Sequence, residues 1–329
     1  MSLIKKSFLV VSLIAMVVGL SSWGFLGHHT TTQLAVYELP KAMQPFFYTH
    51  VKGLVKDCTR PDERRSSDPT EATKHFIDLE AYGDSAAYKM PTNWDDAIAK
   101  YGKDSLLKYG YVPYHIIAMK AKLTEAFKAK DTEKILFLAA DIAHYIEDAH
   151  VPLHTSLNYD GQLTNQKGLH ALWESVTPEV ALGTYNLRSR HKATYLDNVE
   201  EAIWADVRAT NELLVNVFAK EKELTAQFPD SLKYKTVFKY GRNIKYYTDA
   251  FAKAYGESLT PSINEQLIKS ADLVADFWYT AWVDAGKPDL EVNLVRAERK
   301  QQRIEMRSFK RNHLLQDNLL LARTAYKAE

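Results

Sequence analysis

The densest cluster of reactive side chains is HYIEDAHVPLH, residues 144–154, which places three histidines and two carboxylates in an otherwise apolar helical pattern. Residues four apart on a helix lie on one face, with Cβ atoms about 5–6 Å apart. His144 and Asp148 can therefore point at a single ion. A proline then ends the helix, and the loop that follows presents His154. These side chains predict a metal site at the end of a helix.

The stretch GLHALWES repeats the arrangement, with His170 and Glu174 again four apart. Imidazole and carboxylate suit zinc, and two or more ions can share a bridging carboxylate. The alternative is a pair of surface contacts, each contributing a few tenths of a kcal/mol. Here the pairs adjoin apolar residues, where an unpaired ionisable group costs several kcal/mol. The repeated clusters therefore favour metal.

The upstream chain supplies more residues of the same types. SSWGFLGHH places Trp23 at the expected mature N-terminus with His28 after it, and RPDERR and KHFID contain Asp62 and His75. With these positions in order, residues 23–285 resemble the zinc-dependent single-strand nucleases of fungi and plants and the related bacterial zinc phospholipase C. The resemblance implies an all-α, compact multi-helix fold and three zinc ions.

The resemblance also implies nine zinc ligands: Trp23, His28, Asp62, His75, His144, Asp148, His154, His170 and Glu174. One ion would bind the four residues from Asp62 to Asp148, and a second the three from His154 to Glu174. Asp57 and Asp68 are alternatives to Asp62, although their spacing fits less well.

The third ion would bind the amino nitrogen and carbonyl oxygen of Trp23, with His28 and a bridging Asp148. An amide nitrogen is a poor ligand, whereas a free α-amine, with a pKa of about 7.7–8.0, deprotonates when a metal competes for it. This site therefore requires signal cleavage after Ser22.

The implied chemistry is metal-assisted hydrolysis of a phosphodiester, with Asp62 and Arg65 as catalytic residues. In the nucleases a cation three residues after the aspartate ligand neutralises the phosphoryl oxygens, and Arg65 has that position, with Arg64 as a neighbouring substitute. A guanidinium fork matches two phosphate oxygens. Phe76 and Asp78 match nuclease positions that stack on and hydrogen-bond a base. The alternatives are a solvated loop for the arginines and ordinary packing for Phe76.

Sequence features disagree about the substrate. The Trp-Gly-x-x-Gly-His spacing and Arg65 resemble the nucleases, whereas Glu174 resembles the phospholipase. NYDGQLTNQKG also replaces the Gly-Gly-Asn stretch of the nucleases. We expect a nuclease acting on single-stranded nucleic acid or nucleotides. The alternatives are a phospholipase C acting on phospholipid head groups and a non-catalytic helical metal-binding protein.

Helices must position these residues, and helical periodicity runs through the chain. Apolar residues recur at intervals of three or four at Ile135, Leu138, Ala139, Ile142 and Ile146, and similarly at Ile203, Val207, Leu213 and Phe218. No long alternating run marks a sheet. Weak Pro and Gly clusters predict loops near residues 61–69, 83–91, 160–168 and 286–288.

Composition predicts an exported globular protein. The 329 residues are 46% hydrophobic, enough for a substantial core. A net charge of +1 argues against a broad surface for duplex nucleic acid. Two lysines precede an uncharged run over residues 7–20, which predicts a signal peptide over residues 1–22 and a periplasmic or secreted protein. The run is shorter than the ~20 residues of a membrane span. The single cysteine, Cys58, excludes an intrachain disulfide.

The mature chain predicts a phosphodiesterase domain over residues 23–288 and a helical extension over residues 289–329. Between Arg296 and Arg311 the extension holds seven basic and two acidic residues. Such a helix either packs by a narrow apolar stripe or contacts a membrane surface or nucleic acid. No obligate protein partner is inferred. The other histidines receive no role, among them His29, His115, His150 and His191.

Overall fold

The computed structural model describes residues 25–239, 241–292 and 294–325. The predicted signal peptide and Trp23 lie outside these ranges. The first part contains α2 (Phe25–Glu38), α3 (Gln44–Thr49), α4 (Val51–Asp57), α5 (Arg60–Arg64), η1 (Ala72–Lys74), η2 (Leu79–Tyr82), α6 (Ala86–Lys89), α7 (Trp94–Tyr101), α8 (Lys103–Tyr109), α9 (Val112–Lys128) and α10 (Thr132–Ala149). The second part contains η3 (Pro152–Thr155), α11 (Leu169–Ala171), η4 (Leu172–Val176), α12 (Thr177–Ala181), η5 (Leu182–Thr184), α13 (Val199–Glu212), α14 (Leu214–Thr225), α15 (Asp230–Lys233), β1 (Tyr234–Lys239), β2 (Arg242–Tyr247), α16 (Asp249–Asp284), α17 (Arg296–Lys310) and α18 (Leu321–Ala325).

The predicted all-α class is confirmed, since helices dominate and the described residues form a single two-stranded sheet. This antiparallel hairpin pairs Tyr234 with Tyr247 and Lys239 with Arg242. No alternating run in the sequence predicted this hairpin. Its turn contains Gly241, whose φ of 72° suits the tight hairpin turns that need a left-handed residue.

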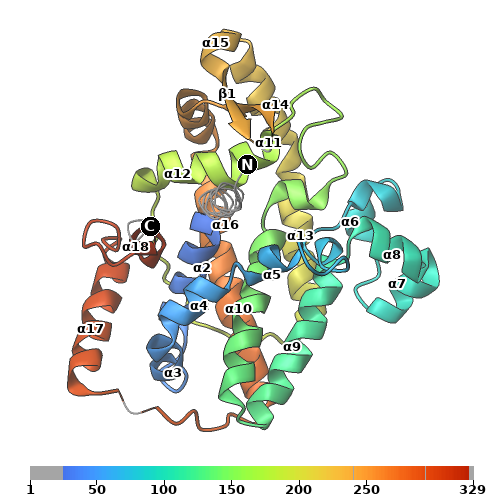
Figure 1. Ribbon diagram of the computed structural model, residues 1–329. Helices are drawn as coiled ribbons and strands as arrows, with labels where there is room; N and C mark the ends of the chain where they lie inside the picture. Colours follow the sequence, from blue (N-terminus) through green and yellow to red (C-terminus); the bar gives the residue numbers. More distant parts are fainter. Residues whose placement is uncertain (1–24, 240, 293, 326–329) are drawn as a thin grey trace, which may run out of the picture.

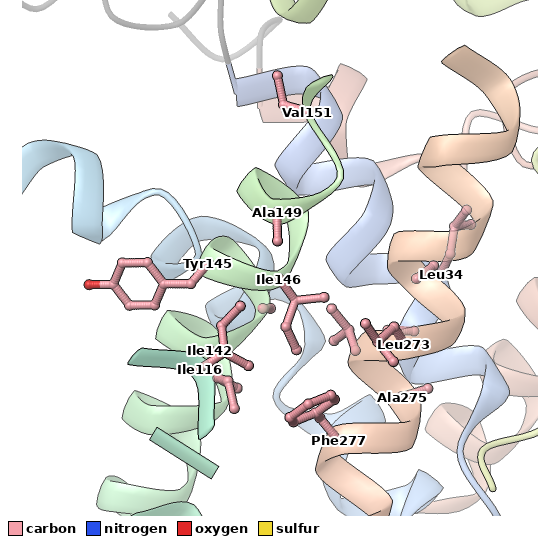
Figure 2. Packing of buried hydrophobic residues seen from close by; sticks show 14 of the residues in the cluster. Leu34, Ile116, Ile142, Tyr145, Ile146, Ala149, Val151, Leu273, Ala275 and Phe277 are labelled. Carbon is pink, nitrogen blue, oxygen red and sulfur yellow. The ribbon is translucent and has the colours of Figure 1, made fainter. Parts of the chain in front are cut away.

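Four helices, α2, α9, α10 and α16, pack together as the centre of the hydrophobic core (Figure 1). Figure 2 shows Leu34, Ile116, Ile146 and Phe277 from these four helices converging in one cluster. Trp278 of α16 is fully buried, and its indole N–H donates to the carbonyl of Ala139 in α10 at 3.1 Å. The long α16 therefore supports α10, the helix that carries the predicted ligand pair.

Hydrogen bonds fix the segments that leave this core toward the predicted site. The Gln266 amide on α16 donates to the carbonyl of His150 at 2.8 Å and to Oγ1 of Thr210 at 2.9 Å, joining the end of α10 to α13. The backbone N–H of Ile77 donates to the carbonyl of His154 at 2.9 Å. The two loops that carry His75 and His154 are thus held together.

Several predicted boundaries change. The predicted loop at 61–69 begins inside helix α5, because Pro61 lies in the first turn, where a missing N–H costs nothing. The predicted loop at 83–91 contains the short helix α6. The periodic run from Ile203 to Phe218 is two helices, α13 and α14, that meet at Leu213. The loops at 160–168 and 286–288 are confirmed as non-helical.

The C-terminal extension contains the predicted helix, α17, and packs on the core. The ring of Phe309 lies 5.3 Å from that of Tyr37 in α2, and Leu314, Leu320 and Ala322 are buried in the same cluster. The apolar side of the extension therefore faces protein. Within the described ranges, no helix is long and apolar enough to cross a membrane. The division at residue 288 stays a prediction.

Gly110 supports the loop that carries His75, and we predict that Gly110→Ala destabilises the fold more than Gly102→Ala. Both glycines have positive φ, 83° and 78°. A Cβ at Gly110 would lie 2.2 Å from the carbonyl oxygen of Phe76, whereas nothing lies within 4 Å at Gly102. Backbone strain costs about 1–3 kcal/mol in both variants, and the clash adds about 1–3 kcal/mol at Gly110. Urea unfolding of both variants measures the difference. Equal stabilities would contradict this account of the loop.

Candidate metal centre

Asp148 lies at the centre of the predicted ligands. It is almost fully buried, 1% exposed, near the end of α10. Its Oδ2 lies 2.8 Å from Nδ1 of His75 and 3.3 Å from Nε2 of His144. Its Oδ1 lies 3.7 Å from Nε2 of His28 and 3.7 Å from Nδ1 of His154. The two oxygens of one carboxylate therefore face different histidines, as a bridging ligand requires.

The first ligand group joins Asp62, His75 and His144, which offer ligand atoms within 4.8 Å of one another. Oδ1 of Asp62 lies 3.7 Å from Nδ1 of His75 and 3.8 Å from Nε2 of His144. Asp57 instead pairs with Arg60, and Asp68 accepts hydrogen bonds from Thr70. Among the three aspartates considered from the sequence, the geometry places Asp62 beside the histidines.

The second group joins His154, His170 and Glu174. His154 lies in the short helical turn η3, which begins at Pro152. His170 lies in α11, and Glu174 lies in η4, the π-helical turn that follows α11. Nε2 of His170 lies 2.6 Å from Oε2 of Glu174 and 2.9 Å from Nε2 of His154. Isolated π-turns within helices are frequent at functional sites. Here the turn directs Glu174 toward both histidines.

The third group contains His28 on α2, with His144 and Asp148. Oε1 of Glu174 also lies 3.5 Å from Nε2 of His28, so this position adjoins the second group. A cavity of about 40 Å³ beside His28 and Glu174 has room for a water molecule or an ion. Trp23, the predicted further ligand here, lies outside the described residues.

One ring nitrogen of His28 and one of His154 meet protein oxygens other than those of Asp148, and the second nitrogen of each ring faces Asp148 or Glu174. Nδ1 of His28 lies 2.6 Å from Oε2 of Glu147, whose Oε1 accepts from Thr32 at 3.0 Å. Nδ1 of His154 donates to the carbonyl of His75 at 2.8 Å. Histidines that bind metals are oriented in this way by a carboxylate or carbonyl on the other ring nitrogen.

Glu71 lies beside His75, and no role was predicted for it or for Glu147. Its Oε1 lies 3.6 Å from Nε2 of His75, and the carboxylate also binds Lys74 at 2.6 Å, Arg64 at 3.2 Å and the Tyr145 hydroxyl. Glu71 lies four residues before His75, whereas Glu147 contacts His28 on a different helix, α2. Arg64 contacts Glu71 and also Asp141, at 2.8 Å, so it supports the residues that surround the predicted ligands.

Electrostatics show how strongly the cluster requires positive charge. Burial would raise the pKa of the Asp148 carboxyl, but His144 and His154 hold it well below its usual range. Burial opposes ionisation of Glu174 in the same way, and His170 holds its pKa well below the usual value. Burial lowers the pKa of His154, yet Asp148 and Glu174 raise it to about 9. Buried carboxylates surrounded by imidazole lone pairs are a donor set that fits zinc.

The predicted catalytic and substrate residues lie around this cluster. Nη1 of Arg65 lies 3.3 Å from Oδ1 of Asp62, and its side chain is 46% exposed, free to meet a ligand. Phe76 is half-buried against Gly110, and the backbone of Asp78 is fixed by a 2.7 Å hydrogen bond to the carbonyl of Tyr109. Burial, with the charge of Glu80, raises the pKa of the half-buried Asp78 carboxyl to about 6.

The four histidines named above without a role belong to none of the three groups. Nδ1 of His150 donates to the carbonyl of Ile146 at 2.8 Å, and Nε2 of His191 lies 2.8 Å from Asp276. Burial lowers the pKa of His29 to about 4 and that of His115 to about 3, so both are neutral near pH 7.

We predict that Glu147→Gln weakens zinc binding about 10–100-fold, because the His28 imidazole loses the carboxylate that orients it. Competition with a chromogenic chelator measures the affinity. Glu133→Gln is the matched control, since Glu133 is exposed at the start of the same helix. Equal zinc affinity in the two variants would contradict an orienting role for Glu147.

Comparison with known proteins agrees with this geometry. Nuclease S1 of Aspergillus oryzae (strain ATCC 42149 / RIB 40) is 26% identical to the chain over 198 residues, which cover 55% of this chain and 62% of that relative. The match thus spans less than two thirds of the relative's length. The S1/P1 nuclease family model matches residues 23–276, a range that contains all nine predicted ligands. Since this match covers most of the sequence, the chain belongs to the S1/P1 nuclease family.

Proposed function

We propose that the protein is an exported, zinc-dependent nuclease that hydrolyses phosphodiester bonds in single-stranded nucleic acid. The observation that carries the proposal is the pair of Asp148 oxygens directed at separate ligand groups in a chain of this nuclease family. The proposal of three zinc ions is supported by three groups of candidate ligands, two of which share His144. The proposed export rests on the predicted signal peptide, whose removal after Ser22 would give Trp23 the free amine that the third ion needs.

When bound, zinc supplies Lewis acidity and lowers the pKa of water, so that hydrolysis proceeds near neutral pH. The residues of the chain hold and position the substrate. Arg65 is exposed beside Asp62, where its guanidinium can bind two phosphoryl oxygens and stabilise the charge that develops on them. Asp62 limits the motion of Arg65 through their 3.3 Å contact.

The predicted substrate-binding residues, Phe76 and Asp78, suit a single-stranded substrate. Phe76 and Asp78 flank the buried Ile77, with the Phe76 carbonyl accepting from Val112 at 3.1 Å. An aromatic face stabilises an unpaired base by about 1–3 kcal/mol. With its pKa near 6, the Asp78 carboxyl is mostly ionised at pH 7 and can accept a hydrogen bond from a base.

The proposal predicts that zinc-loaded protein cleaves single-stranded DNA and RNA, and that Arg65→Ala lowers kcat/KM about 100-fold or more without loss of zinc. Removing one positioned charge from a developing phosphoryl charge has this effect, whereas an exposed ion pair with Asp62 contributes at most about 1 kcal/mol to stability. Cleavage rates and zinc content measured on the same samples test both statements.

Glu63→Ala is the matched control, because Glu63 is exposed in the same short helix. Phosphatidylcholine is assayed in parallel. Intact single-stranded DNA and RNA with zinc-loaded wild type would refute the proposal, and turnover of lipid alone would identify a phospholipase C. Zinc binding without turnover of any of these substrates would identify a metal-binding protein. Normal cleavage by Arg65→Ala would remove its assigned role.

A further inference from the structure

A second candidate site lies beside the C-terminal extension, away from the metal centre. A cavity of about 820 Å³ opens between the end of α2, the extended segment 188–193 and α17. We call it the α17 groove. Its size is in the range of small-molecule and cofactor sites. Figure 1 places α17 at the edge of the molecule opposite α7 and α8.

Three segments far apart in sequence hold the groove in shape. The backbone N–H of Ala193 donates to the carbonyl of Glu38 at 3.0 Å. The Tyr37 hydroxyl donates to Glu305 at 2.9 Å, and the Gln44 amide donates to the carbonyl of Tyr37 at 3.2 Å. The groove is therefore a built feature of the fold.

The groove is lined by basic residues that the protein leaves unneutralised. Five basic residues line it, and all are exposed: Lys41, Arg188, Arg190, Lys192 and Lys310. Within the described chain, none of their side chains forms an ion pair or a hydrogen bond. Elsewhere many lysines and arginines have a carboxylate partner, as Lys74 has Glu71. Five free cations around one cavity create a positive potential that attracts anions.

The floor of the groove adds a buried polar group. Glu38 is 2% exposed, and neither carboxyl oxygen has a hydrogen bond of ordinary geometry within the described residues. Burial and the negative charge of Asp272 raise its pKa well above the usual range. The carboxyl therefore holds its proton more readily than an exposed glutamate and cancels less of the positive charge around the groove.

A membrane surface is the less suitable occupant. The two apolar residues that the extension contributes to the groove, Met306 and Phe309, are turned toward Tyr37 and Gln44, and Ile304 is the one large apolar side chain exposed on the described α17. Surface-bound helices need a free apolar face to enter lipid. Nucleic acid needs only phosphate contacts, with polar groups for bases or sugars.

We propose that the α17 groove is a secondary binding site for the phosphate backbone of single-stranded nucleic acid. This inference rests on the proposed nuclease function and adds a site that uses Lys310, which lies beyond the family match ending at residue 276. His28 and Glu38 share helix α2, ten residues apart, so about 15 Å separates groove and metal centre along its axis. A strand joining them over the surface would therefore need at least about five stacked nucleotides.

The test is the double variant Arg190→Glu/Lys310→Glu, compared with Lys103→Glu/Lys253→Glu. The control lysines are exposed and without ion pairs in the described structure. Zinc-loaded protein is titrated with a fluorescent, cleavage-resistant phosphorothioate oligothymidylate, and turnover of a thymidine dinucleotide is measured separately. We expect the groove variant to bind the oligonucleotide about tenfold more weakly, with a salt slope smaller by about 2, and to turn over the dinucleotide normally.

Equal oligonucleotide binding by the two double variants would overturn the proposal, whatever the activity. Loss of binding to phosphatidylserine vesicles, with oligonucleotide binding unchanged, would also overturn it in favour of a membrane contact. If wild type cleaves nothing while the groove variant alone loses oligonucleotide binding, the groove stands and the proposed nuclease function fails. The two failures are thus distinguishable.

Discussion

The structure depends on one constraint, the burial of the Asp148 carboxylate near the end of α10. A lone buried carboxylate is unstable, so it must be neutralised by protonation, by cationic partners or by metal. Here His75 and His144 face one oxygen, and His28 and His154 face the other. Four segments of the chain are therefore organised around a single side chain of α10.

The surrounding architecture explains how that arrangement stays rigid. Helices supply the core, in which α16 supports α10 through Trp278. Two of the predicted ligands lie in short non-α-helical turns, His154 in η3 and Glu174 in the π-helical turn η4. Outer carboxylates such as Glu147 then fix the ring orientations. Precise geometry at a metal depends on such supporting contacts as much as on the ligands.

The sequence predicted the features that local rules determine. Helical periodicity located α10, and spacing of four brought His170 and Glu174 to within 2.6 Å. The resemblance, drawn from ligand order, is confirmed by the family match. Glu71 and Glu147 were missed because their role depends on which way the histidine rings turn, which spacing alone does not reveal. The β1–β2 hairpin and the α17 groove arise from pairings between segments, and periodicity within one segment cannot show these.

The most direct test of the central claim is zinc content per chain, measured on protein secreted and processed by its own signal and on its Asp148→Asn variant. A carboxylate that would bridge the first and third ions predicts close to three zinc ions in the wild type and about one in the variant. Zinc near zero in the wild type would mean that the cluster is a protonated polar network, and an unchanged zinc content in the variant would mean that Asp148 bridges nothing.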